Sequence, residues 1–93
     1  MTPKERALAE IYASEVAAQQ RWRHWKGDTY TVVSLGLLEA TMDAMVICSD
    51  SVGVTWVWPL FVFLEEHSPG VRRFTKIEEP PARDSQPRVG RFI

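Results

Sequence analysis

Apolar residues make up 45% and charged residues 25% of this 93-residue chain, whose formal net charge is −1. These proportions are typical of one small globular domain, and the charge excludes a general attraction to nucleic acid or to an anionic membrane. No apolar stretch approaches the ~18 residues of a membrane span, the charged N-terminus does not resemble a secretory leader, and the single cysteine, Cys48, fits a reducing compartment. We therefore expect a cytoplasmic protein without a membrane partner.

The first predicted element is an amphipathic helix over residues 1–20. Thr2 can cap it, Pro3 suits the first helical position, and Glu5 can complete a capping box. Apolar side chains then recur at helical spacing and form one narrow stripe: Leu8, Ile11, Tyr12 and Val16. Because an isolated helix of this length is marginal in water, the stripe should dock on the rest of the domain or on a second copy.

Residues 21–26 interleave basic and aromatic side chains and predict a first strand. Alternation along a strand would place Trp22, His24 and Lys26 on one face and the other three on the opposite face. A structural strand, with the Arg and Lys stems lying over apolar surface, is the favoured interpretation. The alternative is a nucleic-acid groove, in which cations meet phosphates and Trp22 or Trp25 stacks on bases. Its candidate residues are Arg21, Trp22, Arg23, Trp25, Lys26, Arg72 and Arg73.

Further strands are predicted over residues 29–35, 45–49 and 54–64, with a last strand over 71–77. Turns are expected at 27–28, 50–53 and 65–70, a bulge or bend at Gly36, and over 37–44 a loop with room for one helical turn. Short strands separated by turns indicate a mainly β protein built as a small antiparallel barrel over residues 21–79. The proline-rich segment 80–93 is predicted to be a flexible tail.

The run from Trp56 to Leu64 is the densest apolar stretch and is interpreted as the strand on which the rest packs. Both of its faces are apolar, so one of them should meet something besides its own small core. Pro59 lacks an N–H, which predicts an edge, a bulge or an interruption in the middle of the run.

The chain resembles the DUF1653 family, a small bacterial and phage domain of unknown function. The resemblance covers residues 21–77 and rests on the segment 23–27 with Tyr30 and Val32, then on Thr41, Asp43, Val46 and Ile47, and then on Trp56, Val57, Pro59, Leu60 and Phe63. It implies a compact SH3-like β-barrel and no established activity. It also implies a bacterial or phage origin, with the host cytoplasm as the compartment of a phage protein.

The chain departs from the family pattern by carrying apolar residues at positions 37, 38, 58 and 61, where the family has charged or ionisable ones, and Cys48 in place of a tyrosine. Exposed together, such side chains would form an apolar patch that monomers usually avoid. The helix could cover the patch, or another protein could. We therefore expect a protein-interaction module that binds a partner, or a second copy in a homo-oligomer, through Trp56, Trp58, Phe61, Leu37 and Leu38.

Catalysis is the least supported class. Cys48 lies in an apolar strand, where burial makes a thiol inert, and no dinucleotide or phosphate-binding motif is present. His24 has no second histidine or cysteine near it in sequence, so a metal site is not expected. The sequence predicts no enzyme activity and no cofactor.

Overall fold

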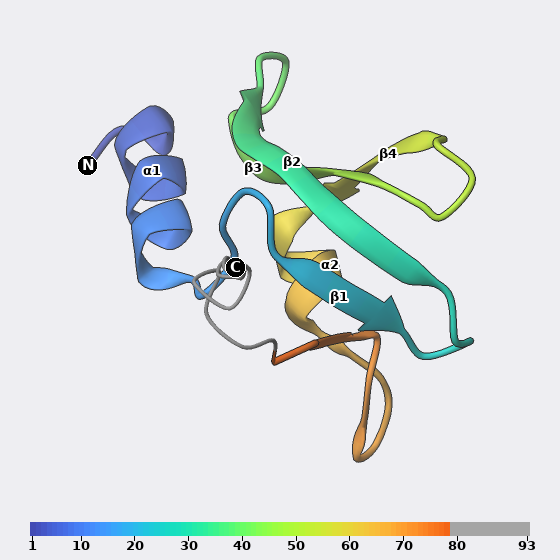
Figure 1. The fold of residues 1–93 in the computed structure, drawn as a ribbon. Coiled ribbons are helices and arrows are strands. Elements are labelled where there is room, and N and C mark those ends of the chain that lie inside the picture. Colours follow the sequence, from blue (N-terminus) through green and yellow to red (C-terminus); the bar gives the residue numbers. More distant parts are fainter. Residues whose placement is uncertain (79–93) are drawn as a thin grey trace, which may run out of the picture.

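The computed structural model describes residues 1–78; the tail predicted over 80–93 lies outside the described residues. A helix, four strands, a short helix and three short strands follow one another along the described part of the chain. Their bounds are α1 Pro3–Ala13, β1 Arg21–His24, β2 Thr29–Leu38, β3 Asp43–Ser49, β4 Thr55–Pro59, α2 Leu60–Leu64, β5 Glu66–Ser68, β6 Val71–Arg72 and β7 Phe74–Lys76 (Figure 1).

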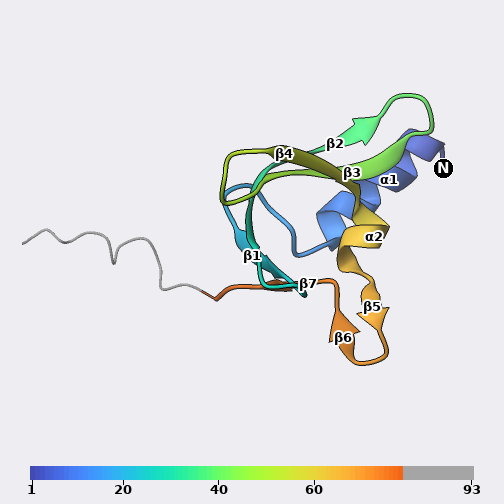
Figure 2. The same cartoon turned by 90° about the vertical axis from the view of Figure 1, so that its right-hand side faces the viewer.

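Five of the strands form one curved antiparallel sheet in the order β4-β3-β2-β1-β7, and β5 and β6 form a separate two-stranded ribbon. Figure 2 shows the sheet bending from β4 and β3 down to β1 and β7, with both helices on its concave side. The protein is therefore mainly β, as predicted, but the sheet does not close. The prediction of a closed barrel was wrong because α2, rather than another strand, follows β4, which leaves β4 and β7 as two edges.

The apolar run from Trp56 to Leu64 changes structure at Pro59. The interruption predicted there is confirmed, but the prediction that the strand continues to Leu64 was wrong, because Leu60–Leu64 is helical. In a strand, Phe61 and Phe63 would share a face. In α2 they separate: Phe63 has no solvent exposure, whereas Phe61 is 66% exposed. Burial of Leu60 and Phe63, three positions apart, is what a one-sided helix provides.

Three aromatic rings form the centre of the core, and each comes from a different element. Trp22 of β1 meets Phe63 of α2 edge to face, with ring centroids 5.1 Å apart, and Phe63 stacks on Phe74 of β7 at 4.1 Å. All three side chains are fully buried. Aliphatic residues from α1, the segment after it, β2, β3 and α2 complete the cluster: Ala7, Val16, Val32, Ala44, Val46 and Leu60. We refer to Trp22, Phe63 and Phe74 as the aromatic core.

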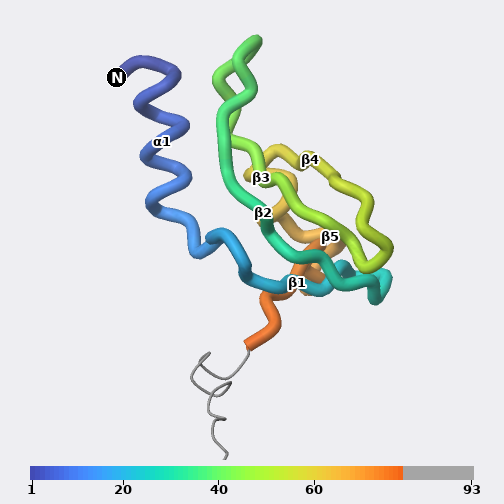
Figure 3. Tube along the Cα trace, turned by 45° about the horizontal axis from the view of Figure 1, so that its top comes forward, coloured from blue at the N-terminus to red at the C-terminus, as the bar shows by residue number. Residues whose placement is uncertain are grey.

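Helix α1 has the capping box that the sequence predicts: Thr2 N–H donates to Glu5, and Glu5 N–H donates to the Thr2 hydroxyl. It ends at Ala13, not at residue 20, because the Gln20 side chain bonds both Ala17 N–H and the Glu15 carbonyl and holds this segment outside a helix. The helix packs on β3 and β2 of its own chain (Figure 3).

The stripe predicted along the helix is only partly buried. Ile11 is half-buried and Val16 is buried beyond the helix end, whereas Leu8 is exposed and Tyr12 is 84% exposed. Ala7, which the stripe does not contain, provides the buried contact of the helix. Leu8 and Tyr12 lie four positions apart on one side of α1, and Ala7 and Ile11 on another; the helix turns the Ala7 and Ile11 side to the core.

Two stretches expected to be irregular are paired strands. Residues 37–44 form the end of β2, a tight turn and the start of β3, and Met42 takes a positive φ of 63° in that turn. The irregularity of this hairpin lies at Val33, between the pairs at Val32 and Ser34, and not at Gly36, which pairs regularly with Met45. Residues 66–72 form the β5–β6 ribbon, so the strand predicted over 71–77 is divided into β6 and β7.

Truncating the two phenylalanines of α2 should have very different effects on stability. Phe63→Ala should lower the free energy of unfolding by about 3–5 kcal/mol, because it opens a cavity beside Trp22 and Phe74. Phe61→Ala should cost less than about 1 kcal/mol, because its ring is mostly in water already. Urea unfolding followed by tryptophan fluorescence measures both. Equal losses would contradict the helical structure of residues 60–64.

Candidate functional site

The five residues predicted to form one interaction surface do not lie together. Trp56 pairs with Cys48 at one end of β3, whereas Leu38 pairs with Asp43 at the other end. Phe61 lies on α2. The remaining two, Leu37 and Trp58, are half-buried and pack against the core, and the Trp58 ring meets Phe74 at 5.3 Å. The prediction of a single patch is corrected accordingly: Trp56, Leu38 and Phe61 are exposed at separate places.

Several exposed apolar side chains lie along the outer edge of the sheet. Among the described residues, strand β4 pairs only with β3. Val54, directly before the strand, and Trp56 and Val57 within it are 47%, 45% and 57% exposed. The sequence from residue 52 to residue 64 contains no charged side chain. We call Val54, Thr55, Trp56 and Val57 the β4 edge. It lacks the lysines with which many proteins protect a free edge from pairing.

Asp50 holds the start of this edge in place. Its carboxylate accepts hydrogen bonds from the backbone N–H groups of Val52 and Val54, at 3.0 and 2.9 Å, and from the indole Nε1 of Trp56 at 2.9 Å. These bonds, the one from Trp56 above all, lower the pKa of Asp50 below its usual value. The turn at 50–53 and the ring of Trp56 are therefore fixed relative to β4.

A shallow apolar groove separates the end of α1 from α2. It measures about 330 Å³ and is lined by Glu10, Ala13, Ser14, Leu60, Phe61 and Leu64. Phe61, whose side chain is largely exposed, forms one of its walls. The helix therefore approaches Phe61 without covering it.

A second hollow brings together part of the predicted nucleic-acid set. It measures about 400 Å³ and is lined by Arg23, His24, Trp25, Gly70, Val71, Arg72 and Thr75. We call it the basic cleft. Trp25 is 41% exposed and stacks on His67 with centroids 3.8 Å apart, and the Lys26 ammonium lies 5.5 Å from the Trp25 ring. An exposed ring flanked by cations is the arrangement that single-strand binding proteins use.

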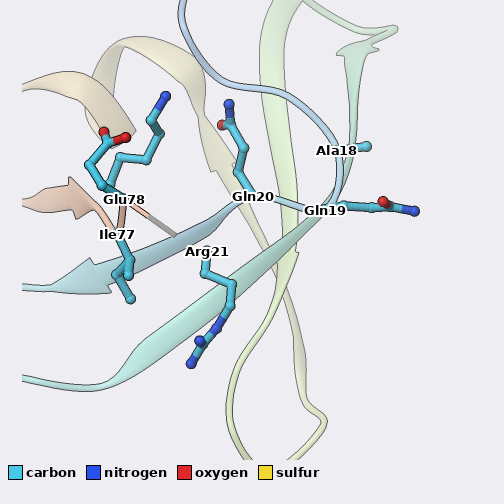
Figure 4. A pocket seen from close by; sticks show the side chains of 7 residues that line it. Ala18, Gln19, Gln20, Arg21, Ile77 and Glu78 are labelled. Atoms are coloured by element: carbon cyan, nitrogen blue, oxygen red, sulfur yellow. The ribbon is translucent and has the colours of Figure 1, made fainter. Parts of the chain in front are cut away.

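The other members of that predicted set do not line the cleft. Trp22 is fully buried, so the prediction that it stacks on a base is corrected. Arg21 lies in a separate hollow of about 300 Å³, where its side chain points away from those of Gln20 and Glu78 (Figure 4). Arg73 pairs with Glu65 at 3.2 Å. The structure thus keeps Arg23, Trp25, Lys26 and Arg72 near one another, holds Arg73 beside them in its ion pair with Glu65, and separates Trp22 and Arg21 from the cleft.

Acidic residues partly neutralise the surroundings of the cleft. Glu15 lies 3.9 Å from Arg72 and 4.0 Å from Lys76. Within residues 1–78, neither Arg23 nor Lys26 forms an ion pair with a carboxylate. These two cations are the ones most available to an incoming anion.

His24 is the residue of the cleft to which the sequence assigned no role. Its ring meets Phe74 edge to face at 5.0 Å, and its Nδ1 accepts a hydrogen bond from Lys26 N–H at 3.2 Å. Burial, followed by the charges of Lys26 and Arg73, lowers the pKa of His24 below its ordinary value of 6.5. The imidazole is therefore neutral at physiological pH, which suits its place between β1 and the aromatic core.

The remaining groups with potential chemical roles are the Cys48 thiol and the possible metal ligands. Cys48 is fully buried, and burial raises the pKa of its thiol to about 11, so it is a protonated thiol at neutral pH. The described part of the chain holds no group of three His, Cys, Asp or Glu side chains placed to bind a metal ion. It also holds no helix that could cross a membrane.

The region that contains the β4 edge and the basic cleft matches a known protein family. The sequence model of DUF1653, a protein of unknown function, matches residues 20–76. This chain belongs to the DUF1653 family. No curated protein and no solved structure matches it. The DUF1653 match includes every strand and α2 but stops short of α1, so the helix is an addition to the matched region.

Some residues at which this DUF1653 chain departs from the family pattern pack on the core, and others are exposed. Cys48 and Trp58 lie on the concave face, where Cys48 is fully buried and Trp58 packs near Phe74. Leu37 is half-buried against the same core. Only Leu38 and Phe61 stay largely exposed. Internal packing therefore accounts for three of the departures.

The pH dependence of stability should report on His24. Because its pKa is lowered in the folded state, the unfolded chain takes up the proton first as the pH falls through about 6.5. The stabilisation is complete above that pH and is lost progressively below it. Urea unfolding between about pH 8 and pH 5 should show this loss, and a His24→Gln variant should show a smaller one. An equal loss in the variant would contradict this assignment.

Proposed function

We propose that this DUF1653 protein is a non-catalytic binding module of the cytoplasm that binds a protein partner along the β4 edge. Its sheet is an SH3-like sheet that is open on one side. The observation that carries the proposal is the combination of an unpaired strand edge with exposed apolar side chains and no charge. A partner strand can hydrogen-bond to such an edge, while its side chains contact those of Trp56 and Val57.

Three features support this surface over the others. Asp50 fixes the edge at its start, and the turn into α2 fixes it at its end, so little ordering entropy opposes binding. Trp56 offers a large amphipathic ring, a residue type enriched where interfaces gain most of their energy. By comparison, the helix groove offers Phe61 and small or partly buried residues, and no free backbone groups in a row.

A lysine on the edge should weaken partner binding. Full-length protein panned against a phage-displayed library of short random peptides should enrich extended sequences with alternating apolar residues. We expect Val57→Lys to weaken the selected peptides by about tenfold or more, which corresponds to about 1.4 kcal/mol. Fluorescence anisotropy of the synthetic peptides measures the affinity.

The matched control is Val33→Lys, because Val33 is similarly exposed, at 53%, but lies in β2 away from the edge. It should bind the peptides as the unmodified protein does. Peptides that bind Val57→Lys undiminished, or a library that yields none, would count against the proposal.

A second candidate function is nucleic-acid binding in the basic cleft. The specific observation that favours it is the exposed Trp25 ring beside Arg23, Lys26 and Arg72. The small number of available cations and the net charge of −1 make this the weaker candidate.

If the cleft binds nucleic acid, a labelled single strand of about 12 nucleotides should bind and lose affinity steeply between roughly 50 and 200 mM salt. Arg23→Ala and Trp25→Ala should each weaken binding. Arg6→Ala, at an exposed position of α1, should not. Anisotropy titrations measure this. An affinity that does not change with salt, or that Arg6→Ala lowers equally, would exclude the cleft as a nucleic-acid site.

A further inference from the structure

The backbone of β4 presents a short and well-defined set of free hydrogen-bonding groups. Asp50 N–H donates to the Val54 carbonyl at 2.9 Å, and along an antiparallel pair the bonding residues alternate. Trp56 and Trp58 therefore bond to β3, while Thr55, Val57 and Pro59 point away from it. Pro59 has no N–H, and as the N-cap of α2 it gives its carbonyl to the helix. Within residues 1–78, the free groups are the N–H and C=O of Thr55 and Val57.

These two residues flank Trp56 symmetrically. We propose that β4 pairs antiparallel with β4 of a second copy of this chain, around a two-fold axis at Trp56. Thr55 then lies opposite Val57 of the other copy, and four hydrogen bonds use every free group of both edges. With the axis at Val57 instead, only the backbone N–H and C=O of Val57 in each copy would form hydrogen bonds. This inference rests on the proposed function, because it uses the same edge and names its occupant.

The side chains fit this register. Trp56 faces Trp56 of the second copy at a non-hydrogen-bonded position, where opposite Cα atoms lie about 4.5 Å apart and aromatic pairs stabilise sheets. On the other face Val57 lies against Thr55. Because residues 52–64 carry no charge, β4 of the second copy brings no like charge against β4 of the first. The two curved sheets would then continue through the pair of β4 strands.

The strand is only five residues long, so the contact is small and the dimer should dissociate on dilution. Light scattering on a sizing column should show the mass rising from 10.6 kDa toward twice that value as the full chain is concentrated. Val57→Lys should remain a monomer over the same range. Val33→Lys should behave as the unmodified chain does.

Two further measurements test the register and do not depend on a single variant. A mixture of Thr55→Lys with Val57→Glu should associate more tightly than either variant alone, because the new lysine faces the new glutamate. In the unmodified protein, hydrogen exchange of the Thr55 and Val57 amides should slow as the concentration rises, while that of Leu38 stays the same.

The outcomes separate this inference from the function on which it rests. A chain that stays monomeric when concentrated, yet binds selected peptides in a way that Val57→Lys abolishes, overturns self-pairing and leaves the binding module standing. A dimer that survives Val57→Lys, with unprotected amides at Thr55 and Val57, overturns self-pairing and places the contact on another surface. A monomer whose edge binds no peptide overturns both.

Discussion

The contact of Phe63 with Trp22 and Phe74 is the constraint on which the rest of the structure depends. It joins α2 to β1 and to β7, elements separated by up to about 50 positions in the chain. Stacked and edge-to-face aromatic pairs each add about 0.5–1.5 kcal/mol beyond the burial of their area. In a domain this small, three such rings are a large part of what holds the sheet in its curve.

The same contact decides which surfaces are free. For Phe63 to reach the aromatic core, the chain has to turn into a helix directly after Pro59, so the strand that could have extended β4 toward β7 is absent. The edge of β4 stays unpaired as a consequence. Its exposed valines and Trp56 are therefore a by-product of how the core is filled, and the binding role proposed for them follows from that geometry.

Electrostatics distinguishes the two candidate sites. The β4 edge is neutral over its whole length, so its recognition depends on backbone hydrogen bonds and apolar contact and should change little with salt. The basic cleft carries cations, but Glu15 and Glu65 lie against Arg72 and Arg73, and the neutral His24 adds no charge. Any ligand there would have to rely on Arg23, Lys26 and the face of Trp25.

Local signals gave a large part of the fold correctly. The capping box of Thr2 and Glu5, the turn at 50–53 and the break at Pro59 depend on neighbours within a few residues, and all three are present. Alternation along residues 21–26 predicted opposite faces for Trp22 and Trp25, and one is buried and the other exposed, although β1 ends at His24 and Lys26 lies by the Trp25 ring. Alternation alone could not say which face is internal, because that depends on where Phe63 and Phe74 lie. For this reason Trp22 entered the candidate nucleic-acid set although it is buried.

The sequence by itself determined the strand-rich class of this protein and the turns at 27–28 and 50–53, because these follow from side-chain preferences over short spans, and it determined the family through the motif residues. Only the tertiary structure decided that Leu60–Leu64 is a helix, since an apolar segment of that length suits a strand or a helix equally until its core partners are known. It also decided that the sheet stays open at β4. The open edge depends on contacts distant in sequence, which no local pattern contains.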